Sequence, residues 1–110
     1  MNIERLKQLE KFLKKEPNDP FLKYAIAMEW INEDIGKAKR YFEVLLEEHE
    51  EYVGTYYHAA KLYAELGESD RAEQIFKKGI IIAEKTGDHH ALRELKSAYN
   101  EFLFDEDDED

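Results

Sequence analysis

One segment of this chain, from Thr55 to Phe76, constrains its fold more than any other. Before Gly67 a pair of alanines lies between tyrosines, and after it Ala72 precedes Phe76 by one helical turn. Apolar residues three and four positions apart share one face of an α-helix, and glycine is typical of the residue that ends a helix. The segment therefore predicts two helices joined by a tight turn, in which small residues of one helix make room for large residues of the other.

The order of these residues resembles the signature of the tetratricopeptide repeat (TPR) family, in which an aromatic residue, a small pair, a tyrosine, a turn glycine and A-x3-F follow one another. In this chain the signature positions are held by Tyr56, Ala59, Ala60, Tyr63, Gly67, Ala72 and Phe76. A second copy lies one repeat length of about 34 residues upstream, where Ala38 and Phe42 match Ala72 and Phe76. The first helices of the two copies align only if the upstream turn, which has Glu33 in place of the glycine, is one residue shorter.

The resemblance implies an all-α fold, an antiparallel array of about six helices arranged as hairpins in a right-handed α–α superhelix. We expect a single TPR-like domain over residues 1–104. Its predicted parts are an N-terminal capping helix (1–16), repeat 1 (17–51), repeat 2 (52–86) and a C-terminal capping helix (88–104). Residues 105–110 are all acidic. Because like charges repel and this tail has nothing apolar to bury, it is predicted to be disordered.

Apolar stripes support the two capping helices. The first stripe consists of Ile3, Leu6, Leu9, Phe12 and Leu13, and the second of Leu92, Leu95, Tyr99, Phe102 and Leu103. Pro17 is expected to end the first helix, because proline disfavours a helical conformation in the preceding residue. Ser69 or Asp70 is expected to cap the helix that begins after Gly67. Gly79 lies inside that helix, where glycine costs about 1 kcal/mol relative to alanine, so we expect a close approach of another segment to its backbone.

Composition and motifs argue against several classes of function. The net charge is −10 at pH 7, of which residues 105–110 contribute −6 and the other residues −4. A chain without clustered Lys and Arg suits neither a nucleic-acid backbone nor an anionic membrane surface. Cysteine is absent, and the scattered glycines and hydroxyl residues form no nucleophile or nucleotide-binding motif. The adjacent His89 and His90 point about 100° apart on a helix and make a poor metal site. We therefore expect no enzyme, no metal and no cofactor.

The resemblance also indicates where a partner would bind, because the first helix of each TPR hairpin lines the concave surface of the array. The residues at these positions are Tyr24, Met28 and Ile31 in repeat 1 and Tyr57, Lys61 and Ala64 in repeat 2, with Arg93 and Lys96 of the last helix as a polar rim. Together they predict an aromatic, apolar groove for a peptide or protein segment. Alternatively, Tyr24, Met28 and Ile31 belong to the core beneath the N-terminal capping helix.

We interpret the chain as a non-catalytic adaptor that binds a protein or peptide partner. Because it has no apolar secretory signal at its start and no apolar run of membrane-spanning length, a cytoplasmic location is expected. The alternative is a structural protein that self-associates as a homodimer through an exposed apolar face. Ile81 is the residue behind this alternative, because the other residues on its face of the helix are polar or charged: Gln74, Lys77, Lys78 and Lys85.

Overall fold

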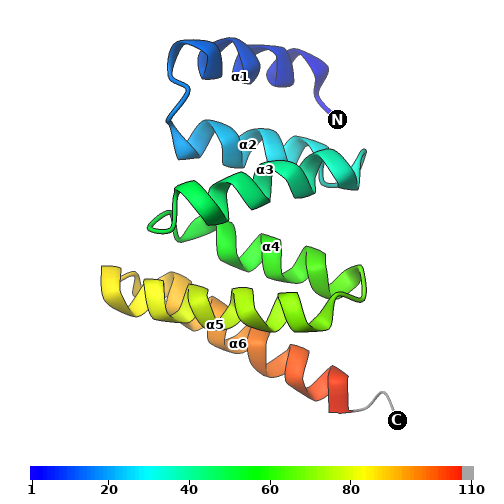
Figure 1. Cartoon of the computed structure of the whole chain (residues 1–110), viewed down its shortest axis with the longest axis vertical. Helices are drawn as coiled ribbons and strands as arrows, with labels where there is room; N and C mark the ends of the chain where they lie inside the picture. Colours follow the sequence, from blue (N-terminus) through cyan, green and yellow to red (C-terminus); the bar gives the residue numbers. More distant parts are fainter. Residues whose placement is uncertain (108–110) are drawn as a thin grey trace. The chain divides into compact units, whose positions relative to one another are not determined.

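The computed structural model describes residues 1–107, and within them the chain consists of α-helices and connecting turns without a β-strand. Figure 1 shows the six helices of this part of the chain. They are α1 (Ile3–Lys15), α2 (Pro20–Trp30), α3 (Ile35–Glu48), α4 (Gly54–Glu65), α5 (Ser69–Thr86) and α6 (His89–Asp107). The prediction of an all-α fold with about six helices is confirmed.

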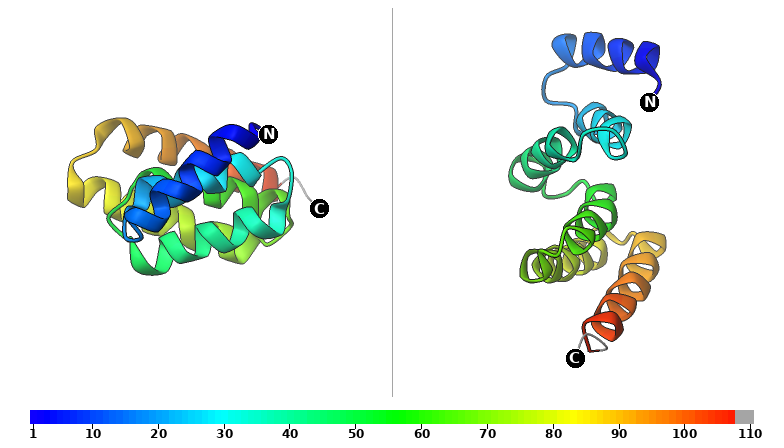
Figure 2. Two further views of the ribbon diagram at one scale, coloured as in Figure 1. Left: turned by 90° about the horizontal axis from the view of Figure 1, so that it is seen from above. Right: turned by 90° about the vertical axis from the view of Figure 1, so that its right-hand side faces the viewer.

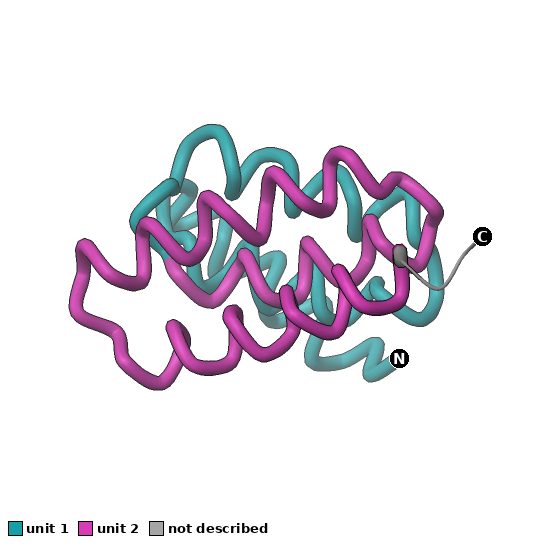
Figure 3. Tube along the Cα trace, turned by 90° about the horizontal axis from the view of Figure 1, so that it is seen from below, with its two compact units in different colours: residues 1–52 teal, residues 53–110 magenta. Residues whose placement is uncertain are grey.

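The helices form two compact units, one made of residues 1–52 and the other of residues 53–110 (Figure 3). Unit 1 contains α1, α2 and α3, and unit 2 contains α4, α5 and α6. Within each unit every helix runs antiparallel to the one before it (Figure 1 and Figure 2), so the first and third helices of a unit point the same way. The division lies beside the predicted border between the two repeats. That the two units form one domain stays a prediction.

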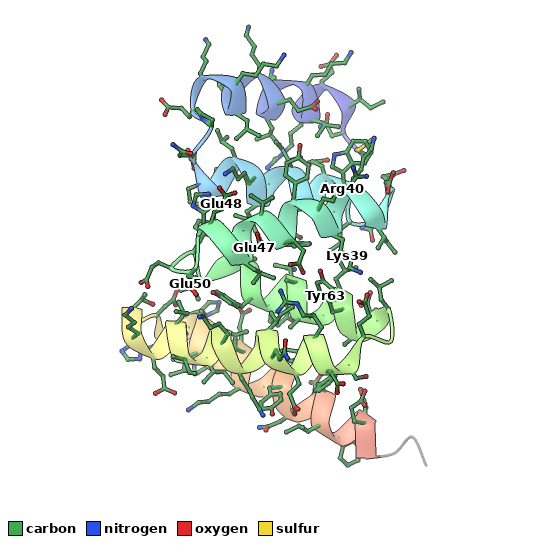
Figure 4. The ribbon with its side chains drawn as sticks, viewed as in Figure 1. Lys39, Arg40, Glu47, Glu48, Glu50 and Tyr63 are labelled. Carbon is green, nitrogen blue, oxygen red and sulfur yellow. The ribbon has the colours of Figure 1, made fainter. Side chains whose placement is uncertain are left out.

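The core of unit 1 is built from small and aliphatic side chains together with one phenylalanine. Its buried apolar residues are Leu6, Leu9, Leu22, Ala25, Ile26, Ala27, Ala38, Phe42 and Leu45. The stripe of α1 is narrower than predicted, because Ile3 and Phe12 keep 58% and 51% of their surface exposed. The acidic side chains of Glu47 and Glu48 at the end of α3, and of Glu50 just after it, are exposed (Figure 4).

Aromatic residues build the core of unit 2. Tyr56 and Phe76 are both only 1% exposed. The ring centre of Phe76 lies 5.6 Å from that of Tyr99 and 5.5 Å from that of Phe102, so α6 covers the phenylalanine of α5. The hydroxyl of Tyr99 also donates a 2.9 Å hydrogen bond to the carboxylate of Glu73 on α5. Four fully buried alanines let the helices approach one another: Ala59, Ala60, Ala72 and Ala83.

The turns that close the two hairpins use different chemistry. Gly67 follows α4 with φ +78°, a left-handed conformation that glycine adopts without steric cost. The upstream turn has no glycine. There, the N–H groups of Glu33 and Asp34 both donate to the carbonyl of Trp30 at 2.9 Å, and the Asp34 side chain accepts from the N–H of Lys37. The departure from the repeat signature therefore changes the turn and leaves the hairpin intact.

Neither Ser69 nor Asp70 caps α5 as predicted. The N-cap residue is Glu68, which makes no side-chain capping bond, and Ser69 is already helical. The hydroxyl of Ser69 instead donates a 2.9 Å hydrogen bond to the carboxylate of Glu106 near the end of α6. A serine at a helix start thus binds another helix rather than its own backbone.

The last helix is longer than predicted. It continues through residue 107, so residues 105–107, which the sequence assigned to a disordered tail, are helical. Glu106 accounts for this, because its carboxylate is bound at the N-terminus of α5, where the helix dipole favours a negative charge. Residues 108–110 of the predicted tail lie outside the described residues.

Candidate binding groove

A pocket of about 670 Å³ lies between α4 and α6 of unit 2, and we call it the α4–α6 groove. Residues of both helices and one residue of α5 line it: Tyr57, Lys61, Ala64, Glu65, Phe76, His90, Arg93, Glu94, Ser97, Ala98, Glu101, Phe102, Asp105 and Glu106. On each helix the lining residues recur at spacings of three and four, so each helix contributes one face. The groove is therefore a property of unit 2 alone.

Short side chains on the two helices create this space. Ala64 of α4 and Ser97 and Ala98 of α6 line the groove where larger residues would fill it. Phe76 and Phe102 also line it, and they are almost wholly buried. An apolar base with polar groups around it is the usual composition of a ligand-binding pocket.

On both helices cationic side chains that line the groove precede the carboxylates of Glu65, Glu101 and Asp105 in the sequence. The ammonium group of Lys61 lies 3.4 Å from the Tyr57 hydroxyl and 5.2 Å from the centre of its ring. This contact holds the lysine beside the aromatic face. Arg93 is exposed, and its guanidinium forms no ion pair with any side chain that the structure describes. His90 lies 3.6 Å from Glu94, one turn away on the same helix.

Carboxylates line the groove further along both helices. Glu65 ends α4, and Glu101 and Asp105 follow one another at a spacing of four on α6; all three are exposed. Glu106 is half-buried by its hydrogen bond to Ser69. Because α4 and α6 run parallel, their helix dipoles point the same way. Both are positive at the N-terminal end and negative at the C-terminal end, which is also the order of the side-chain charges. The groove therefore has a cationic end and an acidic end.

His58 lies beside the groove without lining it. Its ring meets the ring of Tyr57 edge-on, with 5.2 Å between the ring centres. Burial lowers the pKa of His58 below its ordinary value of 6.5; Lys61 acts in the same direction, and Glu94 opposes both. The imidazole is consequently neutral at pH 7 and adds nothing to the positive charge at the cationic end.

The family is decided by the alignment of the chain with known proteins. The model of the tetratricopeptide repeat family matches residues 30–96, which is more than half of the sequence. The chain belongs to the tetratricopeptide repeat family. No curated protein sequence matches it at a significant level.

Two solved structures of one TPR domain protein from Salinibacter ruber resemble this chain. The crystal structure is 40% identical over 77% of this chain and 96% of its own, with a TM-score of 0.74. The solution NMR structure is 40% identical over 78% of this chain and 88% of its own, with a TM-score of 0.73. The predicted family and the helical-repeat fold are confirmed.

The structure places the predicted binding residues in two groups. The structure brings together Tyr57, Lys61, Ala64 and Arg93 around the α4–α6 groove. Lys96 is exposed but does not line this groove. The three predicted residues of repeat 1 belong to unit 1 and are half-buried: Tyr24, Met28 and Ile31. The ring of Tyr24 there packs against Tyr52, with 5.8 Å between the ring centres.

The acidic end of the groove was not predicted from the sequence. Its residues on α6 continue the spacing of four that starts at Arg93 and passes through Ser97 to Glu101 and Asp105. That spacing was a usable signal, because residues four apart on a helix share a face. Glu101 lay inside the predicted helix and was overlooked, whereas Asp105 was missed because the sequence alone placed the end of the helix before it.

A smaller hollow, of about 370 Å³, occurs in unit 1 and is lined by Glu10, Trp30, Lys37, Arg40, Tyr41 and Val44. The ammonium group of Lys37 lies 4.2 Å from the centre of the Trp30 ring. These two lining residues of the hollow therefore already make a cation–π contact with each other.

No group of three or more His, Asp or Glu side chains among the described residues is placed to hold a metal ion. None of the described helices has the length and apolar character needed to cross a bilayer. The cytoplasmic location stays a prediction.

Proposed function

We propose that this TPR protein is a non-catalytic adaptor whose α4–α6 groove binds a segment of a partner protein. The TPR fold generally mediates protein–protein interaction. The observation that supports this particular site is the combination of an apolar base, made by Phe76 and Phe102, with exposed charges at both ends of the groove. Protein segments present apolar and charged side chains together, so such a surface can bind both kinds at once.

The same groove offers little for catalysis. Ser97 is its one aliphatic hydroxyl, and within the described residues it forms no hydrogen bond with a histidine. A serine nucleophile needs an adjacent base to remove its proton. His90 instead lies close to Glu94, and both side chains are exposed to solvent. These features support binding rather than bond cleavage.

Self-association is the second candidate function, and Ile81 supports it. This side chain is 61% exposed on α5, outside the core as predicted. Its neighbours Lys77 and Lys78 on the same helix are exposed as well. A single isoleucine among lysines buries little apolar area, so we favour the groove.

The test compares two double variants that remove the same chemistry from different faces. Tyr57→Ala with Lys61→Ala strips the groove of an aromatic ring and a cation. Lys77→Ala with Ile81→Ala removes a cation and an apolar side chain from the exposed face of α5. Truncating a central aromatic anchor commonly costs 2 kcal/mol or more in binding, about thirty-fold in affinity.

The partner is first captured from the source cell with the parent protein and identified, and its affinity is then measured by calorimetry for each variant. We expect the groove variant to lose binding at least thirty-fold and to keep its melting temperature within a few degrees. The α5 variant should bind like the parent. Parental affinity in the groove variant, with loss in the α5 variant, would move the site to the face around Ile81.

A further inference from the structure

We infer that the α4–α6 groove selects an extended peptide whose acidic and basic residues lie about four positions apart with an apolar residue midway. This inference rests on the proposed function and adds the chemistry of the bound segment. The inference comes from the unequal distribution of charge along the groove. Binding of an apolar segment to the base alone would need no such distribution.

The separation of the two ends sets the spacing. On α4, Lys61 and Glu65 are four residues apart, about 6 Å of helical rise, and on α6, Arg93 and Asp105 are twelve apart, about 18 Å. The centres of the cationic and acidic ends are therefore separated by about 12 Å, the mean of these values. An extended chain advances about 3.3 Å per residue, so about four residues span this distance.

An extended peptide also satisfies the chemistry between the two ends. Side chains at alternate positions of an extended chain point the same way, so residues i, i+2 and i+4 face the groove together. An acidic residue at one end would then meet Lys61 and Arg93, and a basic residue at the other would meet Glu65, Glu101 and Asp105. The middle residue would lie over the apolar base.

We commit to an extended segment because it brings an acidic, an apolar and a basic residue to the groove within five consecutive positions. A helix rises only about 1.5 Å per residue, so it needs a longer segment to reach both ends. The helical alternative would place the two charges about eight residues apart, which the test distinguishes.

The two ends of the groove carry unequal numbers of charged groups. At pH 7 the acidic end carries four carboxylates, from Glu65, Glu101, Asp105 and Glu106, although the last is already bound by Ser69. The cationic end carries Lys61 and Arg93, and the carboxylate of Glu94, the residue after Arg93, offsets part of their charge. The basic residue of the peptide should therefore be selected more strongly than the acidic one.

The probe is a random library of twelve-residue peptides displayed on phage, selected against three forms of the full chain. These are the parent, Ala98→Trp, which places an indole in the groove, and a charge-reversed form with Lys61→Glu and Arg93→Glu. The reversed residues are exposed, so this form should fold like the parent. Circular dichroism verifies the fold of each form before selection.

We expect the parent to enrich peptides with an acidic and a basic residue four apart, in either chain direction, and Ala98→Trp to enrich none of them. The charge-reversed form should prefer peptides with basic residues at both positions. It should also bind the parental peptides roughly three- to thirty-fold more weakly, as for one or two exposed ion pairs. This preference should diminish in high salt.

The remaining outcomes separate the inference from the proposed function. Groove-dependent peptides without this charge pattern, or with the charges eight apart, would overturn the inference and leave groove binding in place. Failure of the parent to enrich any peptide that Ala98→Trp loses would overturn both, because the groove would then bind no peptide. If Ala98→Trp does not fold, the Tyr57→Ala, Lys61→Ala variant replaces it as the control. Peptides that bind in the groove should then bind the parent and not this variant.

Discussion

Tyr56 lies directly against the backbone of Gly79. A Cβ atom added at Gly79 would come within 2.5 Å of the Cβ of Tyr56 and 3.2 Å of a methyl group of Leu95. Real Cβ atoms do not approach this closely, so α4 and α5 can pack together here only because residue 79 has no side chain. The close approach expected at this mid-helix glycine is confirmed.

Gly79→Ala should consequently destabilise the protein despite the higher helix propensity of alanine. Overpacking a filled core typically costs about 1–3 kcal/mol, which outweighs the gain of about 1 kcal/mol from propensity. Urea denaturation measures the difference. Gly36→Ala is the matched control: its nearest contact would be an ordinary 3.4 Å from an Asp34 oxygen, so it should be neutral or stabilising. Equal stability of Gly79→Ala and the parent would contradict the observed contact.

The hydrogen bond between Ser69 and Glu106 should stabilise the end of α6. Ser69→Ala removes the donor at a partly buried site, and we expect a loss of about 1 kcal/mol in the free energy of unfolding. Ser97→Ala, an exposed serine within α6, controls for the change in helix propensity. In a double-mutant cycle with Glu106→Ala, which removes the acceptor, the two losses should not add. Additive losses would mean that the two side chains do not interact in solution.

His58 should make stability depend on pH. Because burial lowers its pKa in the folded state, the unfolded chain binds the proton first as pH falls through the ordinary value of 6.5. The contribution of His58 to the free energy of unfolding is complete above pH 6.5. It is lost as the pH falls from 6.5 to the lower pKa that His58 has in the folded state. We expect His58→Gln to flatten the decline in unfolding free energy between pH 8 and pH 5. His89→Gln controls for removing an exposed imidazole. An unchanged slope in His58→Gln would show that His58 is solvated in the folded protein.

Most of the fold follows from patterns that are local in the sequence. The apolar periodicity and the small residues around Phe42 and Phe76 predict both hairpins, and Gly67 and Gly87 mark the helix ends that they form in the structure. These signals suffice because capping, periodicity and left-handed glycine depend on neighbouring residues.

What the sequence missed depends on contacts between distant segments. The end of α6 could not be predicted because it requires Glu106 to meet Ser69, which lies 37 residues away. For the same reason Asp105 and Glu106, two of the carboxylates that line the groove, were assigned to a tail. Lys96 was predicted with Arg93 as a polar rim on the last helix, whereas α6 aligns Arg93 with the groove and leaves Lys96 outside its lining.

Amide chemical-shift mapping tests the proposed binding site most directly. The ¹⁵N-labelled chain is titrated with the segment of the captured partner that binds it, and the shifted residues are compared with the lining of the α4–α6 groove. We predict that the largest shifts occur at Lys61, Ala64, Arg93 and Ala98, with little change around Ile81. Large shifts around Ile81, with unchanged amides on the facing sides of α4 and α6, would contradict the proposal that this groove is where the protein binds its partner.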